Sequence, residues 1–263
     1  MTTLTPDTIA HLAAHLERAE LEAFAVDKIT DDHPGMDEDD AYAIQHEIRR
    51  RKIGRGARIV GYKAGLTSRA KMRQMGVETP SYGFLADYFA VPDGGEVAMA
   101  ELIHPKVEPE LAFVTKAPLR GPSCHMAQVL AATDFVLPAV EIIDSRYRDF
   151  RFDVNSVIAD NSSSSRFVLG GRMGRLEDQD LPSLGVVLEK NGEPVAFGAG
   201  AAVLGHPASA LAMVVNLLGR RGEELPAGSI VLSGSITEAI AVQAGDAVTM
   251  RAQGLGSLSV RFR

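Results

Sequence analysis

Two glutamates stand two residues apart in a largely apolar stretch, residues 104–114. Side chains alternate along an extended chain, so Glu108 and Glu110 are predicted to point to the same side of a strand. Two anions held together among apolar residues repel each other unless a cation or a proton joins them. Oxygen ligands alone favour Mg²⁺ or Mn²⁺ over zinc, because no Cys or His lies at ligand spacing within this strand. The alternative is a solvated edge strand, in which Glu and Pro are both ordinary.

A third carboxylate interrupts a second apolar run, residues 135–144, which reads Phe-Val-Leu-Pro-Ala-Val-Glu-Ile-Ile-Asp. Such a run predicts a buried strand. An isolated ionised glutamate there would cost several kcal/mol, so Glu141 must be neutral, paired or metal-bound. The sequence therefore predicts a metal site formed by Glu108, Glu110 and Glu141.

The elements that carry these carboxylates follow a mixed pattern. Thr5-Pro6-Asp7 predicts the start of one helix, and an acidic first turn with the basic run 49–52 at its end predicts a second. We predict an α+β fold in which a helical portion, residues 1–57, packs on a β-rich body, residues 58–263. Predicted elements of the body are a strand at 59–65, a helix at 67–75, a helix from Ser123, a hairpin over 186–197 around Asn191-Gly192, a helix from Pro207, and strands near 230–232, 248–250 and 258–260.

The composition narrows the class of partner. The chain has 263 residues, of which 46% are hydrophobic, and a net charge of −7 with Lys and Arg scattered. This argues against a nucleic-acid-binding face and against a polybasic membrane patch. The single cysteine, Cys124, excludes an internal disulfide and fits a reducing cytoplasm. No signal peptide or membrane-spanning run is visible, so we expect a cytoplasmic protein that binds a small molecule.

Longer motifs run through nearly the whole chain. They are Gly61-Tyr62-Lys63-Ala64-Gly65-Leu66-Thr67-Ser68, Tyr82-Gly83-Phe84-Leu85, Pro105-Lys106-Val107-Glu108-Pro109-Glu110-Leu111-Ala112-Phe113, Pro138-Ala139-Val140-Glu141-Ile142-Ile143-Asp144-Ser145-Arg146, Ala159-Asp160-Asn161-Ser162-Ser163, residues 198–207, Ser233-Gly234-Ser235 and residues 254–262. With these motifs the chain resembles the 2-keto-4-pentenoate hydratase and 4-oxalocrotonate decarboxylase group of the fumarylacetoacetate hydrolase superfamily.

The resemblance implies a mixed β-sandwich or β-roll body that holds Mg²⁺ or Mn²⁺ on Glu108, Glu110 and Glu141, with the 2-oxo acid of the substrate chelating the ion. Two activities share this site within the group. Hydratases add water to 2-hydroxypenta-2,4-dienoate, and decarboxylases form that dienol from 2-oxohex-3-enedioate in the meta-cleavage degradation of aromatic compounds. The chain is more similar to the decarboxylases, for example in residues 66–77 and 133–141, so we expect decarboxylation.

Other side chains become candidates for catalysis and substrate binding. Lys63, inside a predicted apolar strand, would bind substrate and stabilise the enolate or relay a proton, paired with Asp87; the alternative is a surface lysine. Lys106 is a second cation of the site or a neutralising neighbour of the glutamates. The resemblance also suggests loop residues that hydrogen-bond the substrate carboxylates, namely Asn161, Ser162, Ser235 and Thr237. Two arginines are candidates for the distal carboxylate, although tight pairing would stabilise it in the ground state and oppose its loss; these are Arg146 and Arg166.

Two other functions stay open. The first is 2-hydroxypenta-2,4-dienoate hydration with the same ion and the same lysine. The second is a catalytically silent subunit that stabilises a partner hydratase. Because the two enzymes of the group act in sequence and associate, the resemblance also implies a complex with the pathway hydratase. We expect the chain itself to form a homo-oligomer.

Overall fold

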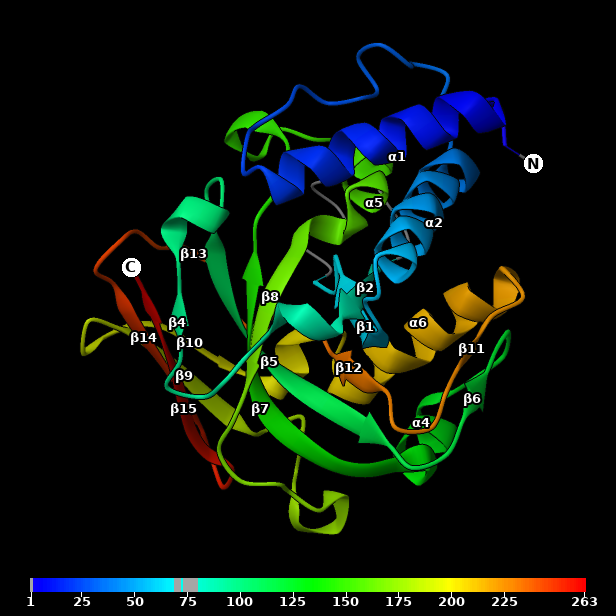
Figure 1. Cartoon of the computed structure of the whole chain (residues 1–263). Helices are drawn as coiled ribbons and strands as arrows, with labels where there is room; N and C mark the ends of the chain where they lie inside the picture. Colours follow the sequence, from blue (N-terminus) through cyan, green and yellow to red (C-terminus); the bar gives the residue numbers. More distant parts are fainter. Residues whose placement is uncertain (1, 69–71, 73–79) are drawn as a thin grey trace.

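The computed structural model describes residues 2–68, 72 and 80–263. The helix predicted over residues 67–75 falls almost entirely outside the described residues. Figure 1 shows the N-terminal helices gathered above the sheets, next to the short helix α5 (Val154–Ala159). The C-terminus lies at the end of a strand on the opposite side of the molecule from the N-terminus.

Two N-terminal helices form as predicted. α1 (Pro6–Leu21) starts behind Thr5, whose side chain caps it, and α2 (Glu38–Gly54) starts with a capping box at Asp37. The helices pack on each other through α1 residues such as Leu16, which is 1% exposed. α2 in turn packs on α5 and on strand β2 (Ser81–Ala86). The predicted domain boundary after residue 57 stays a prediction.

The basic run at the end of α2 is held by ion pairs. Arg51 lies 2.6 Å from Glu17 of α1, and the buried ammonium of Lys52 lies 2.7 Å from Glu20 of α1. The predicted compensation of the α2 dipole is therefore joined by cross-helix pairs that fasten α1 to α2.

The large sheet is built around two long antiparallel strands, β5 (Lys106–Thr115) and β7 (Thr133–Ile143). Its strand order is β2-β1-β12-β5-β7-β8-β3, with β13 paired to β5. The pairs β1–β12 and β3–β8 are parallel, and the other pairs are antiparallel. The remaining strands of this sheet are β1 (Ile59–Gly65), β12 (Ile230–Leu232), β8 (Ser164–Leu169), β3 (Ala90–Val91) and β13 (Ile240–Ala241).

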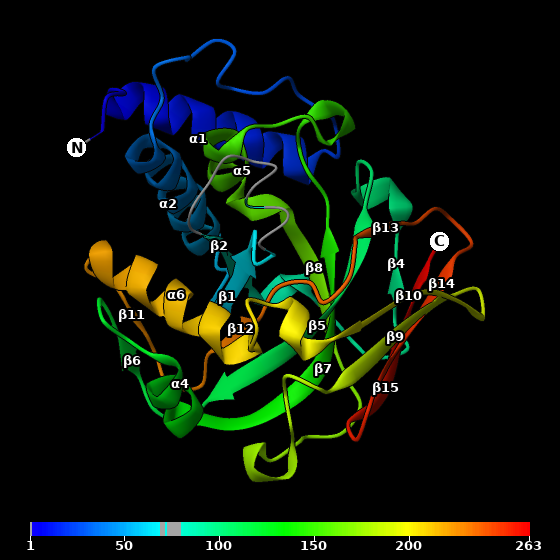
Figure 2. The ribbon, with the colours of Figure 1, turned by 180° about the vertical axis from the view of Figure 1, so that it is seen from behind.

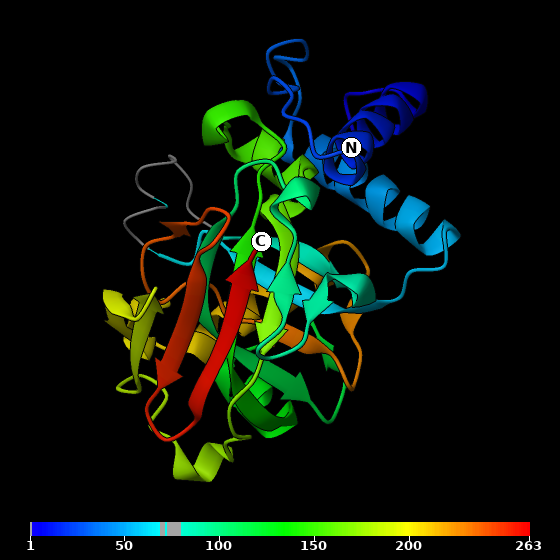
Figure 3. The same cartoon turned by 60° about the vertical axis from the view of Figure 1, so that its left-hand side comes forward.

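A second sheet packs on the first, with the order β10-β9-β14-β15-β4. Figure 3 shows β14 and β15 standing in front of the large sheet, and both strands contact β7. The predicted hairpin is confirmed as β9 and β10, joined through Asn191 and Gly192. The strands of this sheet are β9 (Gly185–Lys190), β10 (Glu193–Ala199), β14 (Ala247–Ala252), β15 (Gly256–Phe262) and β4 (Glu96–Val97); β6 (Leu119–Arg120) and β11 (Glu224–Leu225) form a separate small pair.

α6 (Pro207–Arg220) packs against β1 and β2, and Figure 2 shows it running below α2. Its side chains Leu211, Val215 and Leu218 are 0% exposed. Within the described residues, the segment Gly200–Arg220 is the one helical segment long and apolar enough to cross a membrane by composition. The buried side chains of α6 explain that composition as the packing surface of a core helix.

The helix predicted from Ser123 begins later, as α4 (Met126–Ala132) behind the N-cap His125. Ser123 has a φ of 82°, which lies in the left-handed region and cannot start a right-handed helix. The boundary prediction was therefore wrong by three residues, although the helix itself is present.

Candidate active site

The register of β5 against β7 brings the three predicted glutamates together. Glu108 lies directly opposite Glu141, and Glu110 lies opposite Ala139. Side chains of opposed residues lie on the same face of a sheet, so all three carboxylates project to one side. Glu108 is 6% exposed, whereas Glu110 and Glu141 are 0% exposed. One oxygen from each carboxylate can be chosen so that all three lie within 4.8 Å of one another.

These carboxylates fit a hard divalent cation. Glu110 Oε2 accepts a hydrogen bond of 2.7 Å from the amide of Gly234, but Glu110 Oε1 and Glu141 Oε1 are buried without a hydrogen-bond partner in the described part of the chain. Buried polar atoms are nearly always satisfied, so orphaned oxygens in one cluster indicate an absent partner. Carboxylate oxygens are the ligands that Mg²⁺ and Mn²⁺ prefer.

The electrostatics of the cluster agree with a missing positive charge. Burial, reinforced by the charges of Glu141 and Glu108, raises the pKa of Glu110 well above its ordinary value. Burial also raises the pKa of Glu141, although the ammonium of Lys63 opposes this shift. Three ionised carboxylates and one ammonium leave two negative charges, which a divalent cation balances.

Lys63 is the cation that the structure supplies itself. It is buried in β1, and its Nζ lies 3.1 Å from Glu141 Oε2 and donates a 3.0 Å hydrogen bond to the carbonyl of Ser162. Burial alone would lower the pKa of Lys63, but the charges of Glu141, Glu108 and Glu110 outweigh it and raise that pKa. The alternative of a surface lysine is therefore wrong.

A left-handed turn presents Ser162 to this lysine. Asn161, Ser162 and Ser163 have φ values of 49°, 51° and 59°. Each such residue costs roughly 1–2 kcal/mol relative to the right-handed form. The turn is held because the side-chain amide of Asn161 bonds to both the N–H and the carbonyl of Phe84 in β2. At Gly83 an added Cβ would lie 2.5 Å from the Asn161 carbonyl, so only glycine allows this approach.

A cavity of about 920 Å³ opens beside the glutamates. Four of the predicted substrate-binding residues line it: Lys63, Ser162, Ser235 and Thr237. Asn161 does not line this cavity, because its side chain points to β2 as described above. We therefore assign Asn161 a positioning role in place of the predicted contact with substrate.

The sequence missed the apolar part of the cavity. Its wall combines residues from β7, β10, α5 with the segment before it, and the turn after β12; they include Ile143, Phe150, Phe152, Val157, Phe197 and Ile236. The alternation of β10 predicts one outward face, but the approach of that face to β5 depends on how the two sheets pack. No local pattern in the sequence contains that information.

Comparison with known proteins places this fold and site in a family. Residues 61–263 match the family model described as fumarylacetoacetate (FAA) hydrolase C-terminal. The chain belongs to this family. The match spans both sheets and all three glutamates, and the two N-terminal helices precede it.

Several members of the fumarylacetoacetate hydrolase family are similar over nearly the full length. The chain is 62% identical to the 4-oxalocrotonate decarboxylase of Pseudomonas sp. (strain CF600), covering 99% of this chain and 98% of the relative. It is 38% identical to the 2-keto-4-pentenoate hydratase of Burkholderia vietnamiensis, covering 97% and 98%. The solved structure of 4-oxalocrotonate decarboxylase from Pseudomonas putida G7, complexed with magnesium and adipate, is 60% identical, covers 100% of both chains and superposes with a TM-score of 0.99.

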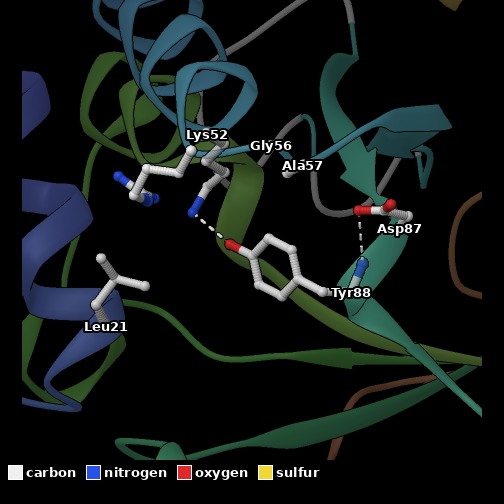
Figure 4. Close-up of a pocket in the computed structure, with 7 residues that line it drawn as sticks. Leu21, Lys52, Gly56, Ala57, Asp87 and Tyr88 are labelled. Carbon is white, nitrogen blue, oxygen red and sulfur yellow. Dashed lines mark hydrogen bonds between the residues drawn. The ribbon is translucent and has the colours of Figure 1, made fainter.

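Asp87 does not lie beside Lys63, so the predicted pairing of these two side chains is wrong. Lys63 lies opposite Gly83 in the β1–β2 pair, whereas Asp87 follows β2 near Ile59, at the other end of the pair. The Asp87 carboxylate pairs with Arg58 at 3.1 Å. Figure 4 shows it in a separate pocket of about 350 Å³, where it accepts a hydrogen bond from the Tyr88 amide.

The two arginines considered for the distal carboxylate are also engaged elsewhere. Arg146 is 2% exposed, and its guanidinium binds the Asp160 carboxylate and the carbonyls of Asp144 and Ser164. Arg166 lies 3.2 Å from Glu101. Neither arginine lines the 920 Å³ cavity. Arg146 instead ties the end of β7 to the turn that carries Ser162.

Arg146→Met is therefore expected to lower the free energy of unfolding by about 3–5 kcal/mol, because it leaves Asp160 buried without its partner. Arg148→Met is the matched control: its pair with Asp27 is exposed, and such pairs contribute roughly 0–1 kcal/mol. Chemical denaturation of both variants measures the difference. Equal losses for the two variants would contradict the structural role of Arg146.

Proposed function

We propose that this chain is a carboxy-lyase that converts 2-oxohex-3-enedioate (4-oxalocrotonate) to 2-hydroxypenta-2,4-dienoate and CO₂. The observation that carries the proposal is the cluster of Glu108, Glu110 and Glu141 beside Lys63 in a cavity of about 920 Å³. The choice within the family is supported by 62% identity to a 4-oxalocrotonate decarboxylase against 38% to a 2-keto-4-pentenoate hydratase.

We propose Mg²⁺ as the cofactor, with Mn²⁺ able to take its place. Glu108, Glu110 and Glu141 would hold it, and their orphaned oxygens support this assignment. A relative 60% identical was solved with magnesium and adipate, a six-carbon dicarboxylate. When bound, the ion supplies Lewis-acid polarisation of the substrate's 2-oxo group.

Lys63 handles the charge that decarboxylation releases. When the C5–C6 bond breaks and CO₂ leaves, the electron pair moves through the conjugated C3=C4 bond to the C2 oxygen. The ammonium of Lys63 has three N–H groups, and its contacts to Glu141 and Ser162 leave at least one for the substrate. We assign this N–H to the C2 oxygen, where it stabilises the enolate and delivers the proton of the dienol.

Loop residues shape the rest of the site. Ser162 and Ser235 line the cavity, and their hydroxyls donate to the carbonyls of Tyr82 and Thr237. Each hydroxyl oxygen retains acceptor capacity, and Thr237 also lines the cavity. We propose that these residues fix the substrate or the water around its carboxylates, while Asn161 holds the turn in place.

Product analysis tests the activity. With Mg²⁺, the purified chain is expected to release CO₂ from 2-oxohex-3-enedioate and to leave 2-hydroxypenta-2,4-dienoate unhydrated. Hydration of the dienoate without CO₂ release would instead assign the hydratase activity. Turnover of neither substrate, combined with stabilisation of a partner hydratase, would assign the catalytically silent subunit.

We also propose that the chain works in the cytoplasm as a homo-oligomer and associates with the hydratase that consumes its product. Apolar side chains exposed near the ends of α1 and α2 support a protein contact: Leu21 is 55% exposed, Ile53 is 49% exposed and Tyr88 is 42% exposed. Light scattering of the chain, alone and mixed with such a hydratase, measures both associations.

A further inference from the structure

Lys106 is a cation of the cavity wall whose contact in the described part of the chain is an aromatic ring and not a carboxylate. It is the first residue of β5 and lines the cavity together with Glu108. They stand two positions apart on one strand, so their backbones lie about 6.6 Å apart and their side chains share one face. Among the described residues, no Asp or Glu lies within ion-pair distance of the Lys106 ammonium. Its contact is the ring of Phe150, whose centroid lies 4.0 Å from Nζ.

The backbone that carries Phe150 is strained. Asp149 and Phe150 have φ values of 58° and 55°, and a bulky residue in this region is an outlier. Such conformations persist where the surrounding structure enforces them, and they cluster at functional sites. The strained turn brings the Phe150 ring into contact with Lys106 and with the imidazole of His104, whose centroid is 4.8 Å from that of the ring. The ring thus holds the ammonium at the cavity without neutralising it.

The three other cations considered for the substrate each contact a carboxylate of the protein. Lys63 contacts Glu141, Arg146 binds Asp160, and Arg166 pairs with Glu101. The cavity wall also contains two carboxylates, Glu108 and Glu238, which would repel a second carboxylate of a ligand. A dicarboxylate therefore needs a cation beside the metal cluster to receive its second carboxylate.

We infer that Lys106, held on Phe150, binds the distal carboxylate of the substrate and makes this cavity select 2-oxo dicarboxylates over 2-oxo monocarboxylates. The inference rests on the proposed function, since the substrate of that reaction carries its second carboxylate at C6. A 2-oxo acid bound at Glu108 extends along the same face of β5 toward Lys106. A hydratase substrate lacks that carboxylate and has no use for the cation.

The ion pair between Lys106 and the distal carboxylate forms in the enzyme–substrate complex, before the C5–C6 bond breaks. The negative charge at C6 disappears as CO₂ forms, so an ion pair with Lys106 is lost on the way to the transition state. Lys106 therefore contributes to binding of the dicarboxylate and opposes, by the same amount, the cleavage of its C5–C6 bond. Replacing it is expected to raise KM for 2-oxohex-3-enedioate about tenfold and to raise kcat as well, so that kcat/KM falls less than the affinity.

Two unreactive ligands isolate the contact. Both 2-oxoadipate and 2-oxohexanoate carry the same 2-oxo acid, but only the first has a carboxylate at C6, and neither has the C3=C4 bond needed for decarboxylation. Calorimetry with Mg²⁺ compares their affinities for the wild-type chain, Lys106→Met, the charge-retaining Lys106→Arg and the control Lys116→Met. Lys116 is an exposed lysine just beyond the other end of β5.

Lys106→Met is expected to weaken the binding of 2-oxoadipate at least about tenfold, as loss of a charged hydrogen bond does, and to leave the binding of 2-oxohexanoate unchanged. Lys106→Arg should retain most of the preference for 2-oxoadipate over 2-oxohexanoate, and Lys116→Met should retain all of it. Equal weakening of the two ligands, or no weakening of either, would overturn the inference. The ratio of affinities is read without turnover, so failure of the proposed decarboxylation would appear separately, as absent CO₂ release by the wild-type chain.

Discussion

Glu110→Gln is expected to remove Mg²⁺ binding and at the same time to make the metal-free protein more resistant to heat. In the metal-free protein, burial first and then the charges of Glu141 and Glu108 raise the pKa of Glu110 and oppose its ionisation. A neutral amide removes that repulsion, and its oxygen can still accept the hydrogen bond from Gly234. The same change deletes one anionic ligand, so Mg²⁺ affinity and CO₂ release should each fall at least about 100-fold. Loss of a group that only supports a ligand typically costs about 10–100-fold, and loss of the ligand itself should cost more.

Thermal unfolding with and without Mg²⁺ measures both effects in one experiment. The wild-type chain should gain stability on adding Mg²⁺, since an ion that binds only the folded state shifts the equilibrium toward it. Without Mg²⁺, the Glu110→Gln protein should unfold at a higher temperature than the wild type, and adding Mg²⁺ should not raise that temperature further. The matched control, Glu96→Gln, replaces an exposed strand glutamate and should behave as wild type. A Glu110→Gln protein that is still stabilised by Mg²⁺ would remove this residue from the ligand set.

Lys63→Met is expected to lower the stability of the metal-free protein and to retain Mg²⁺ binding, which is the opposite of the result expected for Glu110→Gln. Loss of its ammonium leaves Glu141 buried without a cation, which should lower the stability of the metal-free protein by about 3–5 kcal/mol. Mg²⁺ should then bind at least as tightly as before, because it no longer competes with a positive charge. CO₂ release should nevertheless fall by roughly 10²–10⁴ at saturating Mg²⁺, because the donor that we assign to the C2 oxygen is gone.

Lys52→Met is the control that separates an effect of Lys63 on catalysis from an effect on the stability of the fold. Lys52 is another buried lysine, paired with Glu20 at 2.7 Å, and it lines the smaller pocket of Asp87 instead of the cavity of Lys63. Its replacement should lower stability to a similar degree and leave CO₂ release by the folded protein intact. Equal loss of activity in the two variants would show that Lys63 acts through stability alone.

The metal ligands could be predicted from the sequence because their pattern is local. Alternation along β5 fixes the common face of Glu108 and Glu110, and burial of a single charge within β7 makes Glu141 a third ligand candidate. Only the pairing of the strands had to be assumed, and the register supplies it by placing Glu108 opposite Glu141. The helices and the hairpin were predicted for the same reason, since caps, turn residues and periodicity act over a few positions.

The positions that the sequence did not predict depend on contacts between distant elements. Asp87 directly follows the strand that pairs with the strand of Lys63, but the antiparallel register puts it beyond Ala86, which lies opposite Ile59, while Lys63 lies opposite Gly83. Arg146 lies next to the predicted metal strand, yet the turn of α5 brings Asp160 to it. The placement of Phe150 under Lys106 depends on two left-handed residues that no propensity favours.

The central claim is that one cation joins Glu108, Glu110 and Glu141. Diffraction from crystals soaked in Mn²⁺, recorded near the manganese absorption edge, tests it most directly. The account predicts one strong anomalous peak within about 2.0–2.6 Å of an oxygen from each of the three carboxylates, at distances typical of hard cations. A peak elsewhere in the cavity, or none at this cluster while the crystals hold Mn²⁺, would contradict it.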